Sequence, residues 1–169
     1  LGDVYKRQSH GADRLTWWNA NSGSFNYATE ISSALDCPSS VFASDLDGDG
    51  DLDVLATSID DDELAWFQNL GGSATSWTYY VISTEEEDPR SAFAIDVDGD
   101  GDMDILTASS GGNGTIALYE SDGAGTWTRN VITSTADGAR SVIALDLNGD
   151  GMPDIVYASQ NDNTIAWYE

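Results

Sequence analysis

Three acidic loops hold the residues of this sequence whose types and spacing could do chemistry. They are the nonapeptides 45–53 (DLDGDGDLD), 96–104 (DVDGDGDMD) and 146–154 (DLNGDGMPD). Several carboxylates within nine residues repel one another, so such a loop is unfavourable without a cation. Hard oxygen ligands that alternate around a tight turn suit Ca²⁺, which accepts six to eight of them. The loops are therefore predicted to bind calcium, with about three ions for the three loops.

The predicted ligands follow from their place in the nonapeptide. Glycine at positions four and six permits the positive φ angles that wrap a chain around an ion. A methionine side chain does not ligate a hard cation, so position seven (Asp51, Asp102 or Met152) is predicted to use its backbone carbonyl. The predicted side-chain ligands, at positions one, three, five and nine, are Asp45, Asp47, Asp49 and Asp53, then Asp96, Asp98, Asp100 and Asp104, then Asp146, Asn148, Asp150 and Asp154.

Other metal sites fit these loops poorly. An EF-hand begins with similar residues but needs a glutamate at position twelve and flanking helices. Position twelve here is Ala56, Thr107 or Tyr157, and the flanking segments have the pattern of strands. The sequence contains one histidine and one cysteine, which excludes a typical zinc site. Plain acidic turns without a metal are the alternative.

The elements that position the loops recur with them. The loops begin at residues 45, 96 and 146, a period of about 50 that is typical of propellers and other arrays. Short β-rich runs precede each loop (strand A) and follow it (strand B), and two more complete each repeat (strands C and D). Four short antiparallel strands per repeat predict a propeller blade. Strand A is the most apolar, so we expect it to be buried on both faces near the central channel.

These strands predict an all-β arc of propeller blades with set boundaries. Residues 9–169 hold strands C and D of one blade (9–32), two full blades (40–83 and 91–133) and strands A to C of a last one (141–169). Because propellers close with about four to eight blades, we expect an arc that is a fragment of a larger propeller. Residues 1–8 fit no repeat and are interpreted as a non-native leader.

Composition excludes several functions. The chain has 30 acidic and 6 basic residues, a net charge of −24, and no basic cluster that could contact nucleic acid. It has no apolar run long enough to insert into a membrane. Cys37 is the only cysteine, so no disulfide forms within the chain; it is an inert, buried thiol or has a partner elsewhere.

The acidic core, preceded by SVxAxD-like strands and followed by an AW[FY]-type strand, resembles FG-GAP/VCBS repeats. These are the calcium-binding propeller repeats of integrin α-subunits and of many bacterial surface proteins. The resemblance runs from about residue 14 to the end, and it implies the same ligand positions as the chemistry above. Asn148 replaces a carboxylate, which implies a weaker third site. Phe-Gly and Gly-Ala-Pro segments are not recognisable, so the bacterial VCBS-like branch matches better than the integrins.

Catalysis has little support in the sequence. His10 is the only histidine and lacks the partners of a nucleophilic set. The acidic stretch 85–88 is interpreted as a solvated loop in preference to an acid/base pair. We therefore expect a non-catalytic adhesion or ligand-recognition role, secreted or at the bacterial cell surface, with structural calcium. The alternative is the propeller portion of a secreted polysaccharide-degrading enzyme, or a carbohydrate-binding module.

The predicted partners are an extracellular protein or glycan and the remaining blades of the propeller. In a four-stranded blade the B–C and D–A loops share the face opposite the acidic loops, which makes that face the expected recognition surface. Its segments are 59–63, 84–90, 109–114, 134–140 and 160–163. Tryptophans recur at fixed blade positions, which favours packing between blades over contact with sugars.

Overall fold

The described part of the chain is built entirely of β-strands. A computed structural model describes residues 3–6, 13–21, 24–71 and 76–169 of the 169, and no helix occurs among them. The strands form four antiparallel sheets, two with four strands and two with three. This confirms the predicted all-β class and the division into two full and two partial blades.

Each sheet keeps its strands in chain order, so every connection within a blade is a hairpin. The first sheet contains β1 (Asp3–Lys6), β2 (Leu15–Asn21) and β3 (Ser24–Ser32). Blade I contains β4 (Pro38–Ser44), β5 (Asp53–Ser58), β6 (Glu63–Asn69) and β7 (Trp77–Ser83). Blade II contains β8 (Pro89–Ile95), β9 (Asp104–Ser109), β10 (Thr115–Ser121) and β11 (Trp127–Thr133). Blade III contains β12 (Ala139–Leu145), β13 (Asp154–Ser159) and β14 (Thr164–Tyr168).

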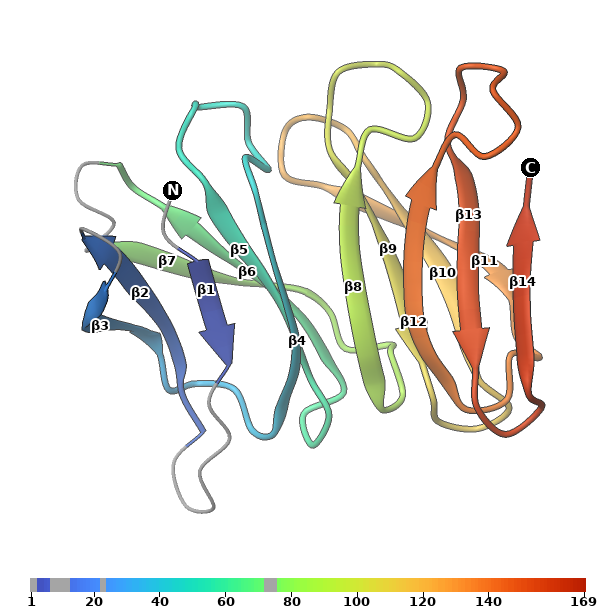
Figure 1. The fold of residues 1–169 in the computed structure, drawn as a ribbon, viewed down its shortest axis with the longest axis horizontal. Helices are drawn as coiled ribbons and strands as arrows, with labels where there is room; N and C mark the ends of the chain where they lie inside the picture. The colour runs from blue at the N-terminus through green and yellow to red at the C-terminus, as the bar shows by residue number, and fades with distance from the viewer. Residues whose placement is uncertain (1–2, 7–12, 22–23, 72–75) are drawn as a thin grey trace.

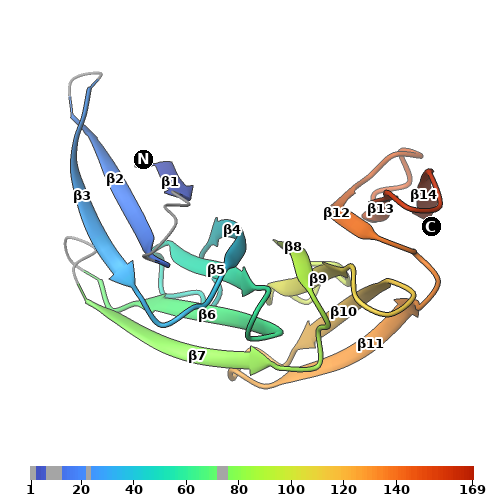
Figure 2. The ribbon, with the colours of Figure 1, turned by 90° about the horizontal axis from the view of Figure 1, so that it is seen from below.

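The sheets follow one another along an arc. Figure 2 shows β4, β8 and β12 on its inner side and β7 and β11 on its outer side. Strand β4 packs against β8, and β8 packs against β12. The first strands of successive blades therefore line the inside of the arc, as strand A does in a propeller.

The start of the chain joins the first sheet. Strand β1 pairs antiparallel with β2, with Val4 opposite Trp17, and so takes the place that strand B has in the other blades. This differs from the interpretation of residues 1–8 as a leader outside the repeats. Residues 1–2 and 7–8 of that stretch, and His10, lie outside the described residues.

Strand B is the most buried strand of each full blade. All six residues of β5 and of β9 are buried, whereas β4 and β8 are buried only in part. The expectation that strand A is buried on both faces is therefore wrong. Strand B is flanked by A and C within its sheet and covered on its faces, while strand A borders the inner side of the arc, where Ala43 is exposed.

Apolar side chains fill the space between neighbouring blades. Trp66 is only 8% exposed and packs with Leu55 and Leu64 of its own blade and Ile105 of the next. Trp127 is partly buried against the same cluster. These two tryptophans therefore pack between blades, as predicted.

The loop before each strand A contains one residue in the left-handed backbone region. It is Cys37 (φ 52°), Asp88 (φ 50°) or Gly138 (φ 68°), and its carbonyl accepts a backbone N–H from the B–C turn of the same blade. Only glycine adopts this conformation without strain. Cys37 is half-buried and reduced, so the expectation of a buried thiol is only partly met.

Blade II contains a buried charged network. The Glu86 side chain is fully buried, and its carboxylate accepts hydrogen bonds from Tyr119 Oη (2.7 Å), Thr107 Oγ1 (3.1 Å) and Ser109 Oγ. Arg129 Nε lies 2.8 Å from Glu86 Oε1 and completes an ion pair. The interpretation of 85–88 as a solvated loop is therefore wrong for Glu86, although Glu85 and Glu87 are exposed. The partner that neutralises Glu86 lies 43 residues away in the sequence.

Among the described residues, the same place in blade I holds no ion pair, although the Tyr79 hydroxyl there donates to the Glu63 carboxylate. The positions equivalent to Glu86, Thr107, Tyr119 and Arg129 hold Leu35, Ala56, Phe67 and Tyr79. Phe67 and Tyr79 stack there, with ring centroids 5.1 Å apart. The four residues differ together between the blades, because a buried carboxylate requires hydrogen-bond donors and a cation around it.

We predict that Arg129→Leu lowers the free energy of unfolding by about 3–5 kcal/mol, because it leaves the Glu86 carboxylate buried without a cation. Urea unfolding measures the loss. Arg140→Leu is the matched control, since Arg140 is exposed. Installing the blade I set (Glu86→Leu, Thr107→Ala, Tyr119→Phe and Arg129→Tyr) should restore most of the stability. An Arg129→Leu variant no less stable than Arg140→Leu would contradict the prediction.

Candidate metal centre

The three acidic loops lie along one edge of the arc. Each joins strand A to strand B, and all three loops stand at the top of Figure 1. The C–D loops lie at the same edge, because strands alternate in direction within each sheet. The predicted ligands of each loop are thus held between two strands whose pairing is fixed by the sheet.

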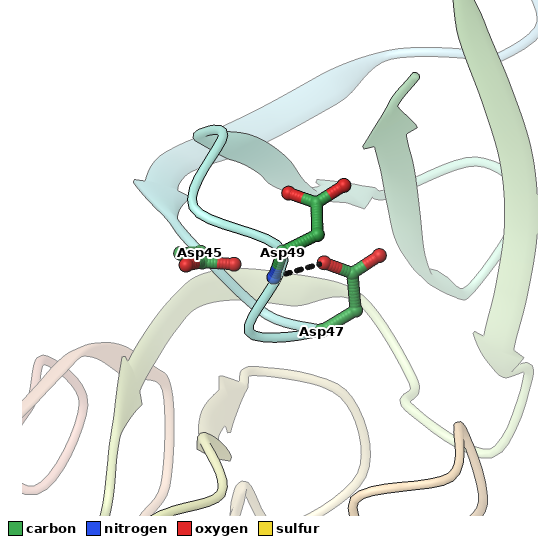
Figure 3. A group of neighbouring side chains, drawn as sticks. All are labelled: Asp45, Asp47 and Asp49. Atoms are coloured by element: carbon green, nitrogen blue, oxygen red, sulfur yellow. Dashed lines mark hydrogen bonds between the residues drawn. The ribbon is translucent and has the colours of Figure 1, made fainter. Parts of the chain in front are cut away.

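The first two loops each bring three carboxylates together. Oxygens of Asp45, Asp47 and Asp49 lie within 4.8 Å of one another, and Figure 3 shows the three side chains on the loop between β4 and β5. In the second loop the corresponding group is Asp96, Asp98 and Asp104. Asp53 and Asp100, predicted as ligands in their loops, lie outside these two groups.

Side-chain oxygens of the loop residues hold the loop backbone in place. In the first loop Gly50 N donates to Asp45 Oδ2 (2.9 Å), Asp49 N to Asp47 Oδ1 (3.1 Å), and Asp51 N to Asp49 Oδ1 (2.9 Å). The second and third loops repeat all three bonds. The loops are therefore folded around their own side chains. In the second and third loops both oxygens of the acid at position one, Asp96 or Asp146, accept backbone N–H groups, so an ion there would share these oxygens.

Glycines at positions four and six have the positive φ angles that the sequence predicts. In the first loop these are 74° at Gly48 and 94° at Gly50, and the other loops have similar values. A Cβ atom at these positions would meet no atom within 4 Å. Backbone conformation alone, and not crowding, therefore requires glycine here.

The aspartate at position nine differs from the other loop acids because it is buried. Asp53, Asp104 and Asp154 are 0%, 3% and 2% exposed. Asp53 Oδ2 accepts the N–H of Leu46 (3.1 Å) and its Oδ1 accepts that of Asn69 at the end of β6 (2.7 Å). Burial raises the pKa of Asp53 to about 6, although both backbone N–H groups act to lower it.

Position nine therefore ties three parts of the blade together. The loop entrance, the start of strand B and the end of strand C meet at this one carboxylate. In blade II, Val97 N (3.0 Å) and Ser121 N (2.9 Å) bind Asp104 in the same way. The sequence predicted these aspartates as metal ligands, but it did not show that they also bond strand C.

A free carboxylate oxygen in the first loop fits a cation. Asp45 Oδ1 is buried and has no hydrogen-bond donor among the residues that the structure describes. A buried carboxylate oxygen without a partner is unfavourable unless an ion binds it. The two ion pairs among the described residues, Arg14–Glu30 and Arg129–Glu86, leave the loop acids without a basic partner. The donor set is all oxygen, which suits Ca²⁺.

The side chain at position seven turns toward the C–D loop. A Cβ on Gly71 would lie 2.9 Å from Asp51 Oδ2, and one on Gly123 would lie 2.3 Å from Asp102 Oδ2. Glycine in the C–D loop is required by its own positive φ, and a side chain there would also displace the carboxylate at position seven. This arrangement is compatible with a role for the backbone carbonyl, and not the side chain, at position seven.

The third loop is more open than the first two. Asp146 is exposed, whereas Asp45 and Asp96 are half-buried. Asn148 Nδ2 donates to Asp150 Oδ2 (2.9 Å). The backbone N–H of Met152, and to a lesser extent this amide, lower the pKa of Asp150. The Asn148 amide thus binds Asp150 Oδ2, whereas the equivalent oxygen of the first loop, Asp49 Oδ2, has no such bond to the residue at position three.

Gln68 on β6 is a neighbour of the first site that the sequence did not reveal. Its Nε2 donates to Asp47 Oδ2 (2.6 Å), and Tyr80 Oη lies 3.3 Å from its Oε1. Its only sequence signal is its place at the end of strand C, where blade II has Glu120.

A family model described as FG-GAP-like repeat matches residues 3–56, 45–107 and 96–157. The chain belongs to the FG-GAP-like repeat family. The first window of this FG-GAP match ends just past an acidic loop, and the other two run from one loop to just past the next. This confirms the family prediction, while the bacterial VCBS-like branch stays a prediction. No curated protein matched the sequence.

FG-GAP repeats are typical of extracellular proteins and are generally non-catalytic. Among the described residues there is no helix with the length and hydropathy to cross a membrane. The FG-GAP match, the blade architecture and the acidic groups together describe a β-propeller-like domain whose loops could hold metal ions.

We predict that position nine and position five respond differently to substitution in the absence of metal. Asp53→Ala removes two charge-assisted hydrogen bonds and should cost about 2–4 kcal/mol of unfolding free energy. Asp49→Ala removes an exposed charge from a repulsive group and also one bond to the Asp51 N–H, two effects that oppose each other, so it should lower the unfolding free energy by less than about 1 kcal/mol. Urea unfolding in EDTA measures both. Equal losses would show that Asp53 has no special structural role.

Proposed function

We propose that the chain is a non-catalytic calcium-binding module of an extracellular protein, in which Ca²⁺ fixes the A–B loops of a β-propeller. The single observation that carries this proposal is the buried, unpartnered Asp45 Oδ1 within a group of three carboxylates. The preformed loop backbone supports it, because a preorganised site loses little conformational entropy when an ion binds.

We assign the ligands by analogy among the three loops. Positions one, three, five and nine contribute side-chain oxygens, and position seven contributes its carbonyl. Position nine can bind an ion while keeping its backbone bonds, since each carboxylate oxygen has two acceptor sites. The third site is expected to be the weakest, because Asn148 supplies a neutral ligand and Asp146 is exposed.

Calcium should raise the melting temperature, and EDTA should lower it again. A site saturated at 100 times its dissociation constant adds about 2.7 kcal/mol of stability. Calorimetric titration should count about three ions, with the weakest assigned to the third loop. Asp49→Ala and Asp100→Ala should each weaken one site, and Asn148→Asp should strengthen the third. A melting curve indifferent to both calcium and EDTA would refute structural calcium.

The recognition role also belongs to this proposal. An adhesion or ligand-binding function and secretion to the cell surface agree with the family and with the net charge of −24. The loops opposite the acidic edge remain the predicted recognition surface for a protein or glycan.

We further infer that another blade of the same kind packs against the face of blade III that points away from blade II. Leu64 and Ile116 are 0% exposed between blades, whereas Ile165, at the same strand position of blade III, is 81% exposed. Trp167 is 50% exposed, compared with 8% for its equivalent Trp66. The partner that fits this face is a sheet like the one that β8–β11 presents to blade I.

The exposed face of blade III should make the 169-residue chain associate as its concentration rises, because apolar patches of this kind bind one another. Sedimentation should show an increasing average mass for the wild type. Ile165→Lys should keep the chain monomeric without changing its melting temperature. Ile116→Lys, at the buried equivalent, should prevent folding. A wild type that stays monomeric throughout would argue against this inference.

A further inference from the structure

A groove between blades I and II lies beside the first acidic loop. It encloses about 630 Å³ and is lined on one side by β6 and β7 and on the other by the C–D loop of blade II, residues 121–127. Leu46 and Asp47 of the acidic loop form its edge. The volume is within the range of about 300–1,000 Å³ that is typical of small-molecule sites.

The floor of the groove is aromatic. Trp66 and Tyr80 stack, with ring centroids 5.0 Å apart and an interplanar angle of 28°. Trp66 is almost fully buried, but Tyr80 is 44% exposed and lines the groove. Trp127 lines the groove from the neighbouring blade.

Hydrogen-bonding groups surround these rings. Gln68 is held by its bond to Asp47 Oδ2, so its amide has a fixed position at the edge of the groove. Ser121 and Thr126 contribute hydroxyls from the opposite wall. An apolar surface bordered by donors and acceptors matches a sugar ring, which has an apolar C–H face and hydroxyls around its rim.

The aromatic floor is not a requirement of the blade architecture. In blade II the positions of Trp66, Gln68 and Tyr80 hold Leu118, Glu120 and Asn130. There Asn130 Nδ2 donates to Glu120 Oε2 (2.7 Å), and no ring stack forms at these positions. One full blade therefore folds with an aromatic pair and the other without it, so the pair is not needed for the blade to fold.

We propose that this groove binds a neutral saccharide of one or two rings, stacked on Tyr80 and hydrogen-bonded to Gln68. Asp47 at the edge and the net charge of −24 disfavour anionic sugars such as uronates. The site lies on the calcium edge of the arc and not on the opposite face predicted from the sequence. The proposed saccharide contacts, Tyr80 and Gln68, are not among the assigned calcium ligands, so the saccharide does not need to bind the ion.

A glycan array that carries neutral and uronate-containing oligosaccharides tests this site with the full chain in calcium buffer. Neutral glycans should be retained and uronates should not. Calorimetry with a retained glycan should then give at least a tenfold weaker affinity for Tyr80→Ala and for Gln68→Ala. Tyr80→Phe keeps the ring and should bind within a few-fold of the wild type.

Asn130→Ala is the matched control, since it changes the equivalent strand position of blade II, and it should bind like the wild type. Melting curves establish that Tyr80→Ala remains folded. Retention of no neutral glycan, or unchanged affinity in the folded Tyr80→Ala variant, would overturn the proposal. Loss of calcium binding with saccharide binding intact would instead count only against the calcium proposal.

Discussion

A buried carboxylate at the end of each acidic loop is the constraint on which the blade depends. Asp53 accepts one backbone N–H from the loop entrance and another from the end of strand C, 16 residues further along the chain. A buried carboxylate is tolerated only when such donors surround it. Its position therefore fixes how the acidic loop, strand B and strand C meet, and with them the place where an ion would bind.

Repulsion among acids shapes the rest of the loop. The loop side chains at positions one, three and five also accept backbone N–H groups, which folds the loop before any ion arrives. The remaining oxygens converge, and at Asp45 one of them has no partner. Stability at this edge and affinity for a cation are thus linked, since the arrangement that disfavours the empty loop is the one that attracts the ion.

The two full blades have the same backbone fold but bury different side chains. Blade I fills the space below its strands with Leu35 and a stacked Phe67–Tyr79 pair, whereas blade II places the Glu86–Arg129 ion pair there. In each blade the residues at these positions suit one another, because all four differ together between the two blades. The same freedom at the outer strands gives blade I the aromatic pair Trp66–Tyr80 where blade II has Leu118 and Asn130, so side chains that line the groove can vary without a change of fold.

The sequence by itself determined the repeat, the four-strand blade and the glycine and aspartate positions of the loops, because these depend on spacing within a few residues. Tertiary structure decided the burial of strand B in preference to strand A, the pairing of Asp3–Lys6, and the burial of Glu86 beside an arginine 43 residues away. It also decided that one oxygen of Asp45 has no hydrogen-bond donor among the described residues, whereas both oxygens of Asp96 accept backbone N–H groups. These features depend on which distant segments meet across a blade or between blades, and no local pattern records that.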